Sequence, residues 1–159
     1  MPSSPELQRA DAKRIVGLAL RTSNAKESNP AEAKIPSLWG RFMAENWAGQ
    51  LEALGAFGPV IAVYSAYETD VGGSYQLLVG RQVQGSAAVS SPVSSVSTQG
   101  GAYLVFKCAG PVPQAVIDGW SDVWAFFERK AAPKRSYTYD FEIYRDGRPV
   151  EIWVAVRES

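Results

Sequence analysis

The strongest constraint on the fold is that one order of predicted elements, strand, helix, strand and strand, occurs twice along the 159 residues. Each predicted strand is a short apolar or alternating run bounded by turn residues. In each predicted helix the apolar residues recur with a period of about 3.6 residues. The predicted elements are Arg14–Thr22, Ile35–Leu54, Val60–Glu68 and Ser74–Val83, then Ala102–Cys108, Pro113–Arg129, Tyr139–Tyr144 and Val150–Val156. We therefore expect a duplicated α+β fold, with an antiparallel sheet, two main helices and a groove between the halves.

The two predicted helices also share a local pattern, in which an apolar residue and a tryptophan are followed by a phenylalanine. The pattern is Leu38, Trp39 and Phe42 in the first helix, and Val123, Trp124 and Phe127 in the second. We expect a flexible tail over residues 1–13 and a single domain over 14–156. Residues 14–83 and 102–156 form its repeats, and the segment 84–101, rich in Ser, Ala, Val and Gly, connects them.

Composition excludes several classes of chemistry. The chain has no histidine and a single cysteine, Cys108, so Ser-His-Asp and Cys-His nucleophile pairs, zinc sites and intramolecular disulfides are not expected. We expect no metal and no cofactor. Sixteen basic residues balance sixteen acidic ones, so charge gives no reason to expect direct nucleic-acid or membrane binding. Met1–Arg14 is polar and no apolar run reaches about 18–20 residues, which predicts a cytoplasmic protein.

The last two predicted strands form a hairpin around Asp146-Gly147, a strong signal for a two-residue turn. In that register Glu142 lies opposite Glu151, and alternation places both on one face of the hairpin with Tyr144 and Trp153. The other face carries the predicted core residues Phe141, Ile143, Val150, Ile152, Val154 and Val156.

Two carboxylates directly opposite each other destabilise a sheet unless something compensates for their repulsion. Water on a solvated face, a basic side chain such as Lys107 or Arg157, or a bound cation could each do so. Aromatic neighbours favour an organic cation, because it needs both a counter-charge and flat apolar surface. A glutamate pair with well-separated pKa values could instead act in general acid–base catalysis.

Several segments together resemble a known family. They are RIVGL, VIAVYSAYETDVGGSYQLLVG, GGAYLVFKCAGP, DGWSDVWAFFER and YDFEIYRDG…VEIWVAV, in that order. In this order they are similar to the GyrI-like small-molecule-binding domain, which is also the effector-binding half of AraC-type and MerR-type multidrug regulators. The resemblance covers about Arg14 to Val156. Only about 13 residues precede the first strand, too few for a helix-turn-helix, so a free-standing domain is expected.

The resemblance implies a duplicated fold with an aromatic groove and a glutamate in the second half that contacts cationic ligands. Glu142, in DFEIY, matches that glutamate, and aligning YSAY with FEIY gives Ser65 as its counterpart in the first half. Glu151 is a second candidate. The other expected ligand-binding residues are the aromatic ones: Trp39, Tyr64, Tyr67, Trp124, Tyr144 and Trp153.

The leading hypothesis is therefore non-catalytic binding of lipophilic, aromatic cations by a sensor or sequestering protein. We expect a monomer or weak homodimer, with a possible separate regulatory protein as partner. Two alternatives come from the family: a protein-interaction role of the gyrase-inhibitor type, and hydrolysis of strained electrophilic compounds by the paired Glu142 and Glu151.

Overall fold

The computed structural model describes residues 5–69, 72–86 and 88–157. Its strands are β1 Glu6–Ala10, β2 Arg14–Ser23, β3 Phe57–Ser65, β4 Ser74–Val83, β5 Ser94–Ser97, β6 Gly101–Cys108, β7 Tyr139–Tyr144 and β8 Val150–Ala155. Its helices are α1 Asn24–Glu27, α2 Ile35–Ala44, α3 Trp47–Glu52 and α4 Gln114–Phe127. The α+β class, the antiparallel sheet and the repeated element order are thus confirmed.

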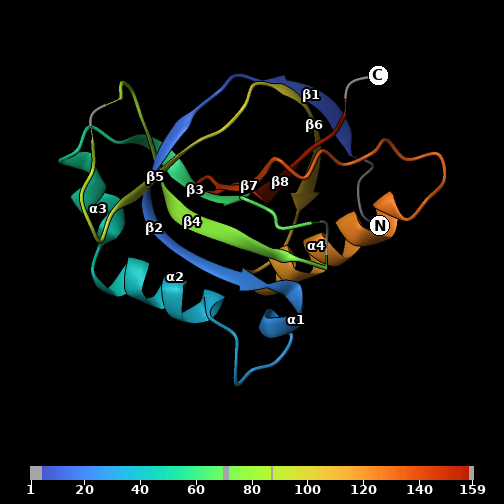
Figure 1. Ribbon diagram of the computed structural model, residues 1–159, viewed down its shortest axis with the longest axis horizontal. Coiled ribbons are helices and arrows are strands. Elements are labelled where there is room, and N and C mark those ends of the chain that lie inside the picture. The colour runs from blue at the N-terminus through green and yellow to red at the C-terminus, as the bar shows by residue number, and fades with distance from the viewer. Residues whose placement is uncertain (1–4, 70–71, 87, 158–159) are drawn as a thin grey trace.

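The eight strands form one antiparallel sheet in the order β1-β6-β8-β7-β3-β4-β2-β5. The two halves meet at the centre, where β3 pairs with β7. The sheet is strongly curved, and α2 and α4 lie on its outer side (Figure 1). Each half therefore contributes its own helix to the same face, and the seam between the halves runs along β3 and β7.

The two edge strands were not expected from the sequence. β1 lies within the predicted tail and β5 within the predicted connector. Each pairs with the other half, because β1 precedes β2 but pairs with β6, whereas β5 precedes β6 but pairs with β2. The connections cross side by side, where Lys13 N donates to Thr98 Oγ1 at 2.9 Å and Thr98 N donates to Lys13 O at 2.7 Å.

The predicted helix Ile35–Leu54 is two helices. Pro36 lies in the first turn of α2, where its missing N–H leaves no hydrogen bond unmade. Asn46 separates α2 from α3 with a left-handed backbone, φ 52°, which ends the helical hydrogen-bond pattern. On the other helix, Gly119 lets α4 approach β6 closely, since a Cβ there would lie 2.4 Å from Cys108 Sγ.

The predicted register of the β7–β8 hairpin is wrong by one residue. Glu142 pairs with Ile152, and Glu151 pairs with Ile143. Five residues, 145–149, separate the strands, and Gly147 adopts a left-handed φ of 70°. An odd loop length reverses the face of every residue on one strand relative to the other.

Both faces of the sheet are buried. The helix face packs against α2 and α3 in the first half and α4 in the second, and Tyr144 touches the cores of both halves. The inner face of the curved sheet has its own core around Ile15, Tyr103 and Phe141. No described helix combines the length and hydropathy needed to cross a bilayer.

Candidate functional site

Glu142 lies at the seam between the two halves, in the middle of β7. It pairs with Ala62 of β3 on one side and Ile152 of β8 on the other, and it faces the helices. Its neighbours in those strands belong to the cores under α2 and α4, and Glu142 itself is only 1% exposed. The strand pairing thus holds a carboxylate in the interior between the two main helices.

Three neutral donors surround this carboxylate. Tyr64 Oη donates to Glu142 Oε2 at 2.7 Å, Trp120 Nε1 donates to the same oxygen at 2.6 Å, and Tyr144 Oη donates to Oε1. Hydrogen bonds from neutral groups lower the cost of burying a charge but do not cancel the charge. Across the described ranges, Glu142 has no ion-pair partner.

Burial raises the pKa of Glu142 above its ordinary value of 4.5, and hydrogen bonds from Tyr144, Tyr64 and Trp120 oppose that rise. Burial and the adjacent Glu142 charge also raise the pKa of Tyr64 and Tyr144, so both phenols stay protonated as donors. The site therefore holds a carboxylate whose ionisation a positive neighbour would favour.

Aromatic rings enclose Glu142 from both helices. Trp39 of α2 packs edge-on against Tyr144, with ring centroids 4.9 Å apart. Trp120 of α4 packs edge-on against Tyr64 at 5.2 Å. Trp124, one turn further along α4, contacts Trp120 at 6.4 Å and is 38% exposed, so it lies at the outer margin of the group.

The two walls are related by the internal duplication. When the two halves are matched by their strand pairings, edge strands included, Ala62 corresponds to Glu142 and Tyr64 corresponds to Tyr144. The predicted counterpart Ser65 is wrong, because Ser65 pairs with Tyr139 and lies on the opposite face of the sheet. The Glu142 carboxylate thus lies close to the pseudo-two-fold axis, between the two equivalent tyrosines.

The tryptophan contacts correct the predicted helix alignment as well. Trp39 contacts Tyr144 and Trp120 contacts Tyr64, so Trp120 is the counterpart of Trp39 in the second half. The predicted alignment of Trp39 with Trp124 is therefore wrong by about one helical turn. Trp120 lies within the predicted helix Pro113–Arg129 but was not among the expected ligand-binding residues. The available signal was its position one turn before Trp124, which places both indoles on one side of α4.

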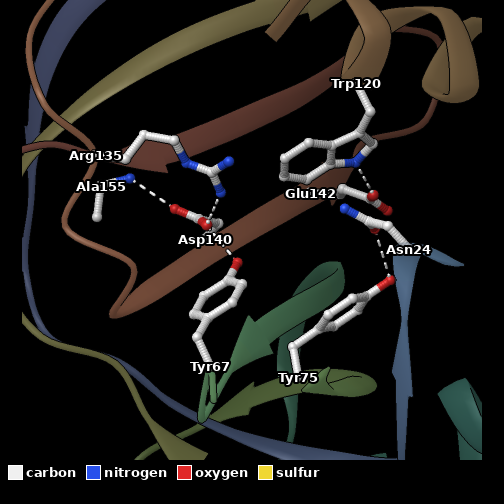
Figure 2. A network of polar contacts seen from close by, with 8 residues as sticks. All are labelled: Asn24, Tyr67, Tyr75, Trp120, Arg135, Asp140, Glu142 and Ala155. Carbon is white, nitrogen blue, oxygen red and sulfur yellow. Dashed lines mark hydrogen bonds and ion pairs between the residues drawn. The ribbon is translucent and has the colours of Figure 1, made fainter. Parts of the chain in front are cut away.

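A second buried carboxylate, Asp140, lies two residues before Glu142 on β7. It accepts from Arg135 Nη2 at 2.8 Å, from the backbone N–H of Ala155 at 2.9 Å and from Tyr67 Oη. Figure 2 shows this group beside the contact between Glu142 and Trp120, with Tyr75 and Asn24 nearby. Tyr67, predicted as a groove residue, therefore hydrogen-bonds Asp140 and not Glu142.

The other predicted residues of the hairpin lie away from Glu142. Glu151 and Trp153 are on the inner face of the sheet, because the register differs by one residue from the prediction. Glu151 accepts from Arg145 Nη1 at 2.7 Å and Trp153 Nε1 at 3.1 Å, while Trp153 stacks on Phe141 at 5.5 Å. The expected face shared by Glu142, Tyr144, Glu151 and Trp153 does not exist.

The site's chemistry is that of an uncompensated negative charge in an aromatic interior. Within the described part of the chain, no group of three or more His, Cys, Asp or Glu side chains could hold a metal ion. Tyr64 and Trp120 both donate to Oε2 of this carboxylate, and Tyr144 donates to Oε1. A buried carboxylate without a positive partner disfavours an anion beside it.

The duplicated fold and the family match that follows fit an effector-type domain that binds small molecules. The chain belongs to the Cass2 family of integron-associated effector-binding proteins, which matches residues 6–156. The effector-binding resemblance expected from the sequence is confirmed by this match.

Three relatives show the extent of the likeness. The chain is 31% identical over 155 residues to the "Putative transcriptional regulator protein YobU" of Bacillus subtilis (strain 168), covering 93% of this chain and 94% of that protein. It is 33% identical to the integron cassette protein VCH_CASS2 of Vibrio cholerae, with a TM-score of 0.83, 98% of this chain and 97% of that one covered. SAV2435, solved bound to tetraphenylphosphonium, shares the fold at 22% identity, with a TM-score of 0.79 over 98% and 94% of the chains.

Proposed function

We propose that this domain binds lipophilic, aromatic monocations at the seam between α2 and α4, with Glu142 as the counter-charge. The observation that carries the proposal is the burial of Glu142 among three neutral donors without a cationic partner among the described residues. A buried charge is costly unless it is paired, and a ligand that brings the missing positive charge removes that cost.

The ring arrangement supports the aromatic character of the ligand. Trp39 and Tyr144 on one side, and Trp120 and Tyr64 on the other, offer faces and edges to a flat group on either side of the carboxylate. Rings of this kind attract an organic cation by about 0.5–2 kcal/mol each, depending on desolvation. SAV2435, which has the same fold, was solved with tetraphenylphosphonium, a cation of the proposed class.

Binding would replace contacts that exist in the free protein. A bulky cation displaces part of the hydrogen-bonded aromatic cluster, so tryptophan fluorescence should report its entry. Because the main requirement for binding is a positive charge that pairs with Glu142, monocations of different shapes would bind after the aromatic rings rearrange. A sensor or a sequestering role follows from such tolerance, in the cytoplasmic setting that we also propose.

The test compares tetraphenylphosphonium with tetraphenylborate, ions of closely matched shape and opposite charge. We expect the cation to quench tryptophan fluorescence and raise the melting temperature, and the borate to do neither. Glu142→Gln should weaken cation binding by about 30-fold or more, since losing one partner of a buried charge pair costs about 2–5 kcal/mol.

Glu151→Gln is the matched control, because this glutamate is on the same hairpin, faces away from the seam and is paired with Arg145. Its affinity for the cation should stay within about twofold of the wild type. Equal binding of the borate, or unchanged cation binding by Glu142→Gln, would refute the proposal.

The catalytic alternative loses the observation on which it depended. Glu142 and Glu151 lie on opposite faces of the sheet, so they cannot act as a facing acid–base pair. No residue pattern in the described structure favours the gyrase-inhibitor alternative over ligand binding. Pull-down with a gyrase subunit remains its direct test.

A further inference from the structure

A second candidate site lies beyond the C-terminal end of α4, away from the contacts of Glu142. It is an open pocket of about 360 Å³ formed by the segment after the helix and by the end of the chain that follows β8. Five cationic side chains and no acidic one line it: Arg129, Lys130, Lys134, Arg135 and Arg157. Because the whole chain has balanced charge, this concentration of positive charge is local.

Arg135 is the fixed element of this basic pocket. It is 7% exposed, and its guanidinium lies 4.4 Å from the ring of Tyr137 and 5.8 Å from that of Phe127. The salt bridge to Asp140 Oδ2, at 2.8 Å, uses Nη2. The Nε–H is buried and has no hydrogen-bond partner among the described residues. A buried donor left unpaired costs about 1–3 kcal/mol, so an acceptor that reaches it would be stabilising.

The remaining cations are exposed and none forms a salt bridge within the described ranges. Arg129 and Lys130 follow the last turn of α4, where positive charge also complements the helix dipole. That explanation does not extend to Lys134 or Arg157, which come from the following segment and the end of the chain. The backbone holds these two together, since Arg157 N donates to Lys134 O at 2.8 Å.

We propose that the basic pocket binds the phosphate group of a small molecule, independently of the cation site. A phosphate group carries close to two negative charges near neutral pH and has several acceptor oxygens. It therefore matches a guanidinium surrounded by other cationic side chains better than a ligand with one carboxylate does. The concave shape favours a small ligand over duplex DNA, and the balanced net charge supplies no long-range attraction for a polyanion.

The experiment titrates the full chain with pyrophosphate, with the ionic strength held constant by sodium chloride, and follows binding by calorimetry and melting temperature. We expect saturable binding that weakens at least tenfold in the double variant Lys130→Gln/Lys134→Gln. Both lysines are exposed, so this variant should fold, whereas substitution of the buried Arg135 would also break its pair with Asp140.

The control is Lys26→Gln/Lys107→Gln, which removes two exposed lysines from other surfaces and should bind pyrophosphate like the wild type. The proposal is wrong if pyrophosphate stabilises the protein no more than chloride does, or if the control loses affinity as much as the pocket variant. It is also wrong if a short DNA duplex binds and pyrophosphate does not. Tetraphenylphosphonium binding, unchanged in the pocket variant, separates this result from the fate of the cation site.

Discussion

Asp140 and Glu142 are two buried carboxylates on the same strand, two residues apart, and their surroundings differ in one respect. Asp140 has a guanidinium in direct contact, together with a phenol and a backbone N–H. Glu142 has only neutral donors, two phenols and an indole. Both carboxylates have their oxygens hydrogen-bonded, but only the first has its charge balanced from within the described chain.

In our proposal, this difference separates a structural carboxylate, Asp140, from a ligand-binding one, Glu142. A complete buried ion pair needs no ligand, and removing one of its partners destabilises the fold because the other charge stays buried and unpaired. A buried carboxylate that has hydrogen bonds but no cation destabilises the free protein, and the proposed ligand would remove that cost. The duplication makes the contrast sharper, because the counterparts of Asp140 and Glu142 in the first half are the apolar Val60 and Ala62.

The largest expected effect tests the stability side of this comparison. Asp140→Asn leaves Arg135 buried without a counter-charge and should lower the free energy of unfolding by about 3–5 kcal/mol. Glu142→Gln, the same change two residues away, should leave it unchanged or raise it, because a buried charge is removed. Denaturant unfolding of the ligand-free variants measures both. Comparable losses in the two variants would show that the carboxylates play the same role.

A pH profile sharpens the binding side. If the proposed cation binds the ionised form of Glu142, its affinity should be constant at pH values above the pKa of Glu142 in the free protein. Below it, affinity should fall about tenfold per pH unit. Because burial raises that pKa, the fall should begin at a higher pH than 4.5. Titrations of tetraphenylphosphonium at successive pH values check this, and Glu142→Gln should give a flat profile.

The same group links stability to pH with a definite sign. Since the pKa of Glu142 is higher in the folded state than its ordinary value, its protonated form contributes stability below pH 4.5 that is lost as pH rises through the folded-state pKa. Unfolding free energies of the wild type, minus those of Glu142→Gln, should therefore fall over that interval. A difference that rises with pH would mean that internal contacts already balance the charge.

The paired tyrosines provide a smaller and more symmetrical test. Tyr64→Phe and Tyr144→Phe each remove one donor to the carboxylate and should raise the pH midpoint of cation binding by about one unit. A hydrogen bond to a charged group contributes about 1.5–3 kcal/mol, and one pKa unit corresponds to about 1.4 kcal/mol. Similar shifts are expected because the duplication relates the two residues. A shift in one variant alone would show that the walls are not equivalent.

The smallest effect concerns the paired glutamate on the other face. Glu151→Gln breaks a partly exposed salt bridge to Arg145, whose side chain is 38% exposed, and should change the unfolding free energy by less than about 1 kcal/mol. Although partial burial opposes it, hydrogen bonds from Trp153 and Arg145 lower the pKa of Glu151, as expected of a carboxylate with its own partners. A large loss of stability here would remove the distinction between the seam and the inner face.

Much of the fold was predictable because glycine, proline and apolar periodicity mark the element boundaries. β4 and β7 begin and end at the predicted residues, and the remaining predicted strands differ by a few residues at their ends. The helix predicted over Ile35–Leu54 was not interrupted in the prediction, since Asn46 has no proline or glycine beside it to signal the break. The edge strands were missed because β1 is largely exposed and β5 is rich in serine, so neither has an apolar pattern.

The candidate site was predictable only in part. Glu142 was identified through the DFEIY segment, and Trp39, Tyr64 and Tyr144 do lie around it. Asp140 was missed although it lies in the same segment, because its partner Arg135 lies outside every predicted helix and strand. Trp120 was missed because a tryptophan on an apolar helical stripe is equally consistent with the core.

The sequence by itself determined the repeated element order, the absence of histidine and the presence of Glu142 in an aromatic-rich closing hairpin. Only the tertiary structure decided which face that carboxylate occupies. Alternation of apolar and polar residues defines a strand register when one face of the strand is solvent-exposed. In β7, however, four consecutive residues, Asp140 to Ile143, are buried. The five-residue loop between β7 and β8 set the register, so that Glu142 faces the helices and Glu151 faces the opposite side of the sheet.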